Sequence, residues 1–302
     1  MFAFGFDSDV AVQDIEDAML KITPLHPLFA AEVIGLDLSG PLDRRIVVEI
    51  RAAFEKHSVL VFRDQAITDD QQVSFSEHFG DLETTKVGTP GAGGKMIVLS
   101  NIGADGQIEA PTGRQVLNNK ANQHWHADSS FKPVPSKASM LSARILPTQG
   151  GNTEYLCMRA VYAALSDADK ALLTGKVAIH DYAYGRSKID SELVTPEERA
   201  AVPPVRQALV LDHGAHGKSL YIGAHCAAIE GMDEAAGRAL IDRLSDFADQ
   251  PQFTYSHVWR PHDLILWDNL SVLHRATPFA STSEPRRMVR TTIAGDGPTL
   301  AA

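Results

Sequence analysis

The chain has 302 residues, of which 44% are hydrophobic and 22% charged, and this is the usage of an ordinary globular protein. The formal net charge of −10 argues against a phosphate-backbone partner, so we expect no nucleic acid to bind. The cysteines, Cys157 and Cys226, form no CxxC pair, which argues against a disulfide framework and a cysteine-ligated zinc site. The sequence contains neither a run of about 18 apolar residues nor a secretory signal, so we expect a cytoplasmic protein without a membrane span.

The first third of the chain predicts an extension followed by helices and strands. Residues 1–18 are acidic and weakly patterned, so we expect an N-terminal extension outside a single domain at 19–302. Hydrophobic spacing predicts a helix that starts at Pro41, and residues 58–63 are apolar enough for a buried strand. Thr68, with a glutamine three residues later, predicts a capping box at the start of a helix that ends at Gly80.

The remainder of the chain predicts many short strands separated by turn signals. Strands are expected at 96–100, 138–145, 219–223, 253–259, 264–267 and 288–293, and helices at 158–165, 167–173 and 233–247. Strands and helices do not alternate regularly and no internal repeat is present. The predicted fold is therefore mainly β with flanking helices, as in a two-sheet sandwich or barrel. Hydrophobicity alone leaves the choice between a jelly roll and other β architectures open.

A candidate metal site combines an early pair of residues with a later histidine. His126 and Asp128 are two positions apart, so on an extended segment both side chains point to one face. His274 follows a hydrophobic, strand-like run and is the best third ligand. Two histidines and one carboxylate form the facial triad of non-haem Fe(II) oxygenases, which leaves positions open. His124 shares the predicted face, so a zinc hydrolase that uses His124, His126 and Asp128 stays open.

A basic strand near the C-terminus predicts an anion-binding pocket. Arg286 and Arg290 are four positions apart and face the same way on a strand, where they repel one another unless each has an anion. The planar guanidinium matches a carboxylate with two hydrogen bonds. Thr153 follows two glycines, and its hydroxyl could add one hydrogen bond to the same ligand. The alternatives are a solvated basic strand and a turn threonine that bonds its own backbone.

Six segments carry a resemblance to a known family. They lie at residues 25–31, 58–63, 122–131, 150–154, 267–269 and 286–292. On these segments the chain resembles the Fe(II)/2-oxoglutarate dioxygenases of the taurine/2,4-D dioxygenase family, and most closely the 2,4-dichlorophenoxyacetate branch. The resemblance implies a double-stranded β-helix, or jelly roll, as the core of the fold.

The resemblance also implies a role for individual residues. It makes His126, Asp128 and His274 the iron ligands, Thr153 and Arg286 the pair that holds the distal carboxylate of 2-oxoglutarate, and Arg290 the residue that grips the anionic group of the prime substrate. Further candidate substrate residues are Ser100 and Asn101 at a strand end, Lys86 and Lys95 beside a glycine-rich loop, and His225. For both lysines and for His225, an ordinary surface or structural role stays open.

The implied reaction is the hydroxylation of an aryloxyalkanoate. With Fe(II), 2-oxoglutarate and O2, the enzyme would hydroxylate the carbon next to the ether oxygen of a small anionic aromatic substrate, and would give a phenol, an oxo-acid, succinate and CO2. One alternative is an alkylsulfonate such as taurine as substrate. Another is a metal-binding β-sandwich that holds a ligand without turnover. Relatives in this family suggest a homo-oligomer.

Overall fold

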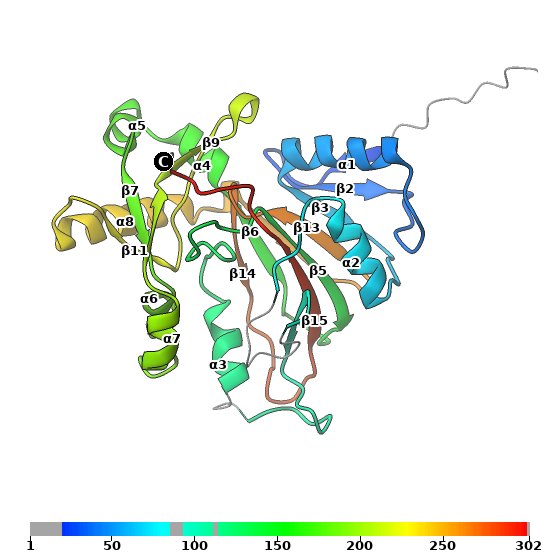
Figure 1. Ribbon diagram of the computed structural model, residues 1–302. Helices are drawn as coiled ribbons and strands as arrows, with labels where there is room; N and C mark the ends of the chain where they lie inside the picture. Colours follow the sequence, from blue (N-terminus) through cyan, green and yellow to red (C-terminus); the bar gives the residue numbers. More distant parts are fainter. Residues whose placement is uncertain (1–19, 85–92, 111–113, 301–302) are drawn as a thin grey trace, which may run out of the picture.

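The computed structural model describes residues 20–84, 93–110 and 114–300, and Figure 1 shows their arrangement. The predicted extension at residues 1–18 lies outside the described residues, so its independence from the domain stays a prediction. None of the helices in the described ranges is both long enough and apolar enough to cross a membrane.

A seven-stranded sheet forms the largest layer of the molecule. Its order is β1-β2-β3-β13-β5-β15-β4, and every neighbouring pair is antiparallel except β2 with β3. The strands are β1 (Lys21–Pro24), β2 (Ala31–Ile34), β3 (Val59–Phe62), β4 (Met96–Ser100), β5 (Ala138–Ile145), β13 (Leu264–Asp268) and β15 (Arg287–Ile293). Strands from both ends of the chain therefore alternate in one sheet, which brings residues near 100 beside residues near 290.

A second sheet of three strands packs on one face of the first. It has the order β12-β6-β14, with β12 at Thr254–His257, β6 at Thr153–Cys157 and β14 at Val272–Ala276. One core cluster joins Val61 and Trp267 of the large sheet to Tyr155 and Val272 of the small one. The two sheets thus form a sandwich, and Figure 1 shows β14 and β6 beside β5 and β15.

Helices cover the opposite face of the large sheet. Successive side chains of a strand point alternately to the two faces, so both faces carry apolar side chains. In β3, Val59 and Val61 face the sandwich, whereas Leu60 and Phe62 face a core that contains Ile50. This second core is covered by α1 (Arg44–His57) and α2 (Asp69–Glu77), at the upper right of Figure 1. Both faces of β3 are buried, which explains its unbroken apolar sequence.

The starts and ends of these helices partly correct the predictions. The capping box of Thr68 is confirmed, since its hydroxyl accepts the backbone N–H of Gln71 and the Gln71 side chain accepts the N–H of Thr68. The predicted start of α1 at Pro41 was wrong, because Asp43 caps the helix by accepting the N–H of Arg45. The predicted end of α2 at Gly80 was also wrong, since the helix ends at Glu77.

A third group of elements surrounds a separate core next to the small sheet. Its strands are β7 (Val177–His180), β8 (Val205–Ala208) and β11 (Cys226–Ile229) in one sheet, with β9 (Val210–Asp212) and β10 (Lys218–Leu220) in another. Its helices are α4 (Met158–Ala164), α5 (Asp167–Leu173), α6 (Tyr182–Ser187), α7 (Pro196–Ala201) and α8 (Glu234–Ala248), with short 3-10 turns at Gly214–His216 and Pro251–Phe253. Leu156 and Leu273 of the small sheet belong to this core, so it supports the sandwich from outside.

The architecture agrees with the predicted class, which is mainly β with helices around it. The predicted strand at 138–145 matches β5, and that at 96–100 matches β4. No strand was predicted at residues 153–157, yet Thr153 begins β6. Helix α3 (Arg114–Ala121) precedes the loop that carries His126 and Asp128, and it lies below the sandwich in Figure 1.

Candidate metal centre and anion pocket

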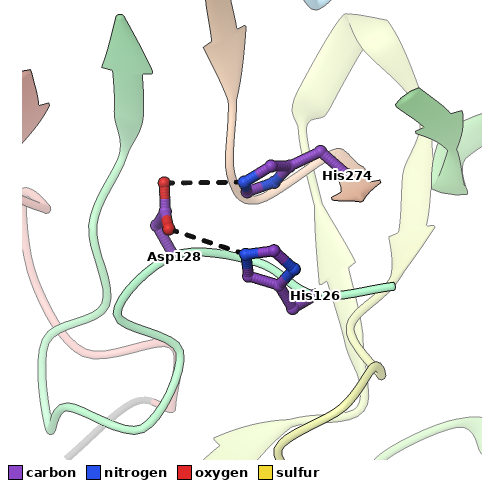
Figure 2. Close-up of side chains that lie close together, drawn as sticks. All are labelled: His126, Asp128 and His274. Carbon is purple, nitrogen blue, oxygen red and sulfur yellow. Dashed lines mark ion pairs between the residues drawn. The ribbon is translucent and has the colours of Figure 1, made fainter. Parts of the chain in front are cut away.

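Three predicted ligands from distant parts of the chain meet at one point. His126 and Asp128 come from the loop after α3, and His274 comes from β14 (Figure 2). One donor atom from each lies within 4.8 Å of the others, and the three residues are buried. The Nε2 of His126 lies 3.9 Å from Asp128 Oδ1, and the Nε2 of His274 lies 3.8 Å from Asp128 Oδ2. This is the arrangement that the His-x-Asp pair and His274 predicted.

The backbone fixes the two histidines relative to one another. His126 and His274 form an antiparallel bridge in which each backbone N–H donates to the other's carbonyl, at 3.1 and 2.9 Å. Gly223 lies against this bridge, with φ +136°, where a Cβ would stand 3.1 Å from the Trp125 carbonyl and 3.4 Å from His126 Cα. Glycine is therefore required at this position for the chain to pass so close to the bridge.

Hydrogen bonds hold the carboxylate of Asp128 in place. Ser139 on β5 donates its hydroxyl to Asp128 Oδ2 at 2.7 Å. Asn269 accepts the backbone N–H of Asp128 at 3.2 Å and donates to the Ser139 hydroxyl at 2.9 Å. Both side chains are fully buried. Such partners around a ligand fix its orientation, and residues of this kind contribute strongly to metal affinity in other proteins.

Local charges favour the protonation states that bind a metal. Burial lowers the pKa of His126 and, together with the neighbouring His126, lowers that of His274 well below the ordinary value. Burial alone would raise the pKa of Asp128, but the charges of Arg290 and the two histidines lower it overall. Near neutral pH, the site therefore offers two neutral imidazoles and one carboxylate, which suit a divalent transition-metal ion.

The alternative ligand set with His124 is not brought together. The side chain of His124 is exposed, and only its backbone carbonyl reaches the site, where it lies 2.8 Å from His126 Nδ1. That contact places the Nδ1 proton on the carbonyl side and leaves Nε2 facing Asp128. Across the described ranges, the one cluster able to hold a metal is His126, Asp128 and His274. The zinc-hydrolase alternative with His124 was wrong in its ligands.

Arg286 is a buried cation next to the triad. It is 9% exposed, and its Nη2 donates to the carbonyl of Gly151 at 3.1 Å. Among the described residues no carboxylate pairs with it, and its Nε has no hydrogen-bond partner. Burial lowers the pKa of Arg286 to about 10, so the side chain stays charged at neutral pH. A buried charge without a counter-ion is costly, which is the property expected of a binding site for an anion.

Glycine at position 151 allows Arg286 to lie where it does. Gly151 has φ +67°, and a Cβ there would stand 3.2 Å from the Nε of Arg286. Two residues later, Thr153 opens β6 and lines the same pocket, and its Oγ1 accepts the indole N–H of Trp259 at 3.0 Å. The structure therefore places Thr153 and Arg286 together, as predicted, and excludes the alternative that Arg286 belongs to a solvated strand.

Arg290 lies in the same pocket in a different setting. Its Nη1 donates to Asp128 Oδ1 at 2.5 Å, so the guanidinium is paired with the carboxylate of the triad. Its role in gripping a substrate anion stays a prediction. Of the two arginines that were expected to face anions, one therefore already has an internal partner and the other has none among the described residues.

The other predicted substrate residues are distributed between the pocket and its surroundings. Ser100 and Asn101 line the pocket, but the Asn101 side chain mainly supports the loop before Arg286, since it accepts the N–H of Arg286 and donates to the carbonyls of Ser281 and Glu284. Lys95 is outside the pocket lining and pairs with Glu77. Lys86 lies outside the described residues.

His225 packs beside the site rather than in the pocket lining. Its ring centroid is 4.9 Å from that of Phe131 and 6.2 Å from that of Tyr182. Burial, followed by the nearby His126, lowers its pKa well below the ordinary value. Gly185 lies directly against its ring, where a Cβ would stand 2.3 Å from Nδ1. These contacts are those of a buried, neutral histidine in an aromatic cluster near the triad.

The pocket that joins these residues carries positive charge and apolar walls. Its charged side chains are Arg286, Arg290 and Lys120 of α3, and none of the described residues that line it is an acid. Apolar walls come from Leu99, Val116, Leu141, Trp267 and Phe279. Such a pocket suits a small anion with an apolar body.

Comparisons with known proteins identify the family. Residues 21–292 match the taurine catabolism dioxygenase TauD, TfdA family. The chain belongs to this family of dioxygenases. It is 40% identical over 277 residues to the alpha-ketoglutarate-dependent 2,4-dichlorophenoxyacetate dioxygenase of a Burkholderia species, which covers 90% of this chain and 93% of that relative. It is 36% identical to an (S)-phenoxypropionate/alpha-ketoglutarate-dioxygenase of Sphingobium herbicidovorans, over 91% of this chain and 95% of that one.

Solved structures of TauD/TfdA dioxygenases share the fold. The crystal structure of AAD-2 in complex with Mn(II) and N-oxalylglycine matches 94% of this chain and 99% of its own, with a TM-score of 0.86 and 41% identity. A taurine dioxygenase from Burkholderia xenovorans matches 93% of this chain and 91% of its own, with a TM-score of 0.75 and 27% identity. The predicted family is therefore confirmed, and the chain is a dioxygenase.

Several residues of the site were not singled out from the sequence. Ser139, Asn269, Gly151, Trp259 and Lys120 reach the ligands or the pocket only through tertiary contacts. The sequence could have indicated Asn269 as a site residue, because a polar residue directly after a buried strand lies at the end of a sheet. For Lys120, no local pattern separates a pocket lysine from a solvated one.

Proposed function

We propose that the protein is an Fe(II)- and 2-oxoglutarate-dependent dioxygenase that hydroxylates small aryloxyalkanoates. The observation that carries the proposal is the buried Arg286 beside a His–Asp–His cluster, in a pocket whose described lining contains three cations and no acid. A dianionic co-substrate and an anionic substrate would supply the missing negative charge. The sandwich of a seven-stranded and a three-stranded sheet supports the finer proposal of a double-stranded β-helix core.

Each residue of the pocket has a defined part in this proposal. His126, Asp128 and His274 would hold Fe(II), and the bound metal would supply the oxidising chemistry with O2 and 2-oxoglutarate. Arg286 and Thr153 would hold the distal carboxylate of 2-oxoglutarate. Ser139 and Asn269 fix the carboxylate of Asp128, so the ligand set needs little rearrangement when the metal binds. Leu141 and Trp267 are apolar residues of the pocket lining and would help to exclude water around the bound ligands.

Substrate recognition in the proposal depends on two cations. Arg290 would contact the acid group of the substrate and so place the carbon that bears the ether oxygen next to the metal. Lys120 lines the same pocket from an exposed position on α3, where it would attract acids as they enter. Hydroxylation of that carbon gives a hemiacetal, which breaks down to a phenol and an oxo-acid. The balanced outcome is one succinate and one CO2 for each 2-oxoglutarate and O2 consumed.

The choice of substrate rests on the names of the relatives. The relatives at 40% and 36% identity are named for 2,4-dichlorophenoxyacetate and (S)-phenoxypropionate, whereas the taurine dioxygenase structure is 27% identical. An alkylsulfonate stays the alternative, because Arg290 would bind a sulfonate as well as a carboxylate. A non-catalytic ligand-binding protein is a further alternative of another class.

The decisive experiment is a substrate panel read out by succinate formation. Purified protein loaded with Fe(II) under anaerobic conditions would receive 2-oxoglutarate, O2 and one of 2,4-dichlorophenoxyacetate, 2-phenoxypropionate or taurine. The proposal predicts equal amounts of succinate and phenol with the phenoxy acids. Turnover of taurine alone would favour the alkylsulfonate alternative, and metal binding without any succinate would favour the non-catalytic one.

Self-association and a cytoplasmic location complete the proposal. Light scattering coupled to size-exclusion chromatography would test the first, with a mass above 32.8 kDa expected for an oligomer. A mass equal to that of one chain across the working concentration range would show a monomer instead.

A further inference from the structure

Trp259 connects the anion pocket to a buried network behind it. Its indole N–H donates to Thr153 Oγ1 at 3.0 Å, and the two side chains are 9% and 3% exposed. Thr153 lines the pocket, whereas Trp259 stands behind it and does not. The hydroxyl of Thr153 therefore has Trp259 as a partner on the protein side, and its residue lines the pocket together with Arg286.

The chemistry of the two groups fixes the direction of this hydrogen bond. An indole N–H can only donate, so the threonine oxygen must accept. A hydroxyl that accepts from one side keeps its own proton for a second bond elsewhere. A threonine hydroxyl without such a partner can instead rotate and donate to its local backbone. Because the indole N–H occupies one side of the Thr153 oxygen, the hydroxyl proton cannot point toward Trp259 and is left for a partner on the remaining sides, which include the pocket that Thr153 lines.

We propose that Trp259 is a positioning residue that directs the Thr153 hydroxyl proton toward the carboxylate held by Arg286. Trp259 need not touch the co-substrate, since it acts through the threonine. This inference rests on the proposed function, because it requires that a carboxylate occupy the pocket beside Thr153 and Arg286.

A rigid support holds the indole in place. Trp259 follows β12, in which His257 pairs directly with Thr153 of β6. The His257 ring packs edge-on against the indole, with centroids 4.7 Å apart. His257 is in turn held by Asp263, with 2.9 Å between Nε2 and Oδ2, and both residues are fully buried. A donor fixed on two sides in this way loses little freedom when the co-substrate binds.

Asp263 also fixes the turn that follows Trp259. Its Oδ2 accepts the backbone N–H of Arg260 at 2.8 Å and a hydrogen bond from Arg63 Nη1 of the neighbouring sheet. The segment from His257 to Asp263 is therefore closed on itself, with the indole projecting from it toward Thr153.

A double-mutant cycle on co-substrate binding tests this inference. The variants are Trp259→Phe, Thr153→Val and the double change, with Thr153→Ser as a matched control that keeps the hydroxyl. Calorimetry would measure the Kd of N-oxalylglycine, a non-reactive analogue of 2-oxoglutarate, for the Mn(II)-loaded protein. We expect Trp259→Phe to raise this Kd about fivefold, the effect of one ordinary hydrogen bond. The same change should have no effect in the Thr153→Val background and its full effect in the Thr153→Ser background.

Steady-state kinetics add a readout that general damage to the fold would not produce. Trp259→Phe should raise the KM for 2-oxoglutarate about fivefold and leave the KM for the prime substrate unchanged. If the phenylalanine variant does not fold, 3-benzothienyl-alanine at position 259 keeps the bicyclic shape and replaces the N–H with sulfur. The same fivefold rise in Kd is expected from that substitution.

The outcomes separate this inference from the proposed function. A loss that is the same in the Thr153→Val and wild-type backgrounds, or no loss at all, would overturn the role of Trp259 and leave the proposed function standing. Wild-type protein that takes up Mn(II) but fails to bind N-oxalylglycine would overturn the proposed function, and the role of Trp259 with it.

Discussion

Arg286 and Arg290 lie four residues apart at one strand and line one pocket, but their surroundings differ. Arg290 pairs with the carboxylate of Asp128 at 2.5 Å. Arg286 is buried against the carbonyl of Gly151, without a carboxylate partner among the described residues. One charge is balanced by the protein, whereas the other has no counter-charge among the described residues. The difference shows that a buried cation indicates a ligand only when the fold leaves it unpaired.

The comparison also distinguishes two ways of using an arginine near a metal. The pair formed by Arg290 and Asp128 helps to keep the carboxylate ionised, since the Arg290 charge lowers the pKa of Asp128. Arg286 lines the same pocket but donates to the carbonyl of Gly151 rather than to a residue of the triad. The first arginine is therefore paired inside the ligand set, whereas the second is the one that we propose holds an anion.

The largest effect is expected from removing a ligand of the triad, since the proposed reaction takes place at the metal that the triad would hold. His274→Ala should abolish succinate formation and weaken Mn(II) binding by more than about 100-fold, because even changes around a ligand weaken binding by ~10–100-fold. His124→Ala is the matched control, since its side chain is exposed and alanine keeps the carbonyl that contacts His126. Calorimetric Mn(II) titration and a succinate assay would measure both, and equal losses in the two variants would contradict this assignment.

Arg290→Met separates the roles of the two arginines in catalysis. At saturating Fe(II), we expect the KM for the aryloxyalkanoate to rise about 100-fold, because removing one partner of a buried charge pair costs roughly 2–5 kcal/mol. The KM for the co-substrate, 2-oxoglutarate, should change much less. Arg287→Met provides the control, since Arg287 is exposed on the same strand. A rise confined to the KM for the co-substrate would reverse the two assignments.

His180 provides a comparison with Arg286, because it is a second buried titratable side chain with an unpartnered nitrogen, but it lies outside the pocket lining. It is buried outside the pocket lining, and its Nδ1 has no partner, but unlike Arg286 it can lose its proton. Burial lowers its pKa from 6.5 to about 4. Between these values the unfolded chain binds the extra proton, so stability falls as pH falls from about 6.5 to about 4.

The expected size of this effect is at most about 3 kcal/mol, from ~1.4 kcal/mol for each pH unit. Urea unfolding of the wild type and of His180→Gln at several pH values would measure it. The glutamine variant should show a shallower loss of stability over that pH range. Parallel pH profiles for the two proteins would mean that His180 is not the group that titrates.

The smallest effect is expected at the entrance of the pocket. Lys120→Met should raise the KM for the aryloxyalkanoate about threefold at low salt, with less effect at high salt, because exposed charges act mainly by attraction and are screened. Lys95→Met is the control, since Lys95 pairs with Glu77 away from the pocket lining. A larger effect of the Lys95 change would restore the sequence-based prediction and remove Lys120 from substrate entry.

The sequence predicted features that depend on neighbouring residues. The capping box of Thr68 needs only a glutamine three residues later, and β5 needs only an apolar run of strand length. The triad was predicted because His126 and Asp128 lie close together and because His274 follows a hydrophobic, strand-like run, a choice that the family resemblance then supported. By contrast, no strand was predicted for β6 (Thr153–Cys157), whose two partners, β12 and β14, follow about 100 residues later.

The contacts that give the site its properties could not be predicted in the same way. The Arg290–Asp128 pair joins residues 162 positions apart, and the Trp259–Thr153 hydrogen bond spans 106. Neither can be inferred from local spacing, because the tertiary arrangement of the two sheets decides which side chains meet. Pro41 and Asp43 were both possible start positions for α1, and the helix begins after Asp43 because the Asp43 side chain caps it.

The most direct test of the central claim is the affinity of the Mn(II)-loaded protein for N-oxalylglycine, measured by calorimetry for the wild type, Arg286→Met and Arg290→Met. If Arg286 is the cation that binds the co-substrate, its replacement should weaken N-oxalylglycine binding about 100-fold, and the replacement of Arg290 should weaken it much less. Equal losses in both variants, or tight binding without Arg286, would contradict the account.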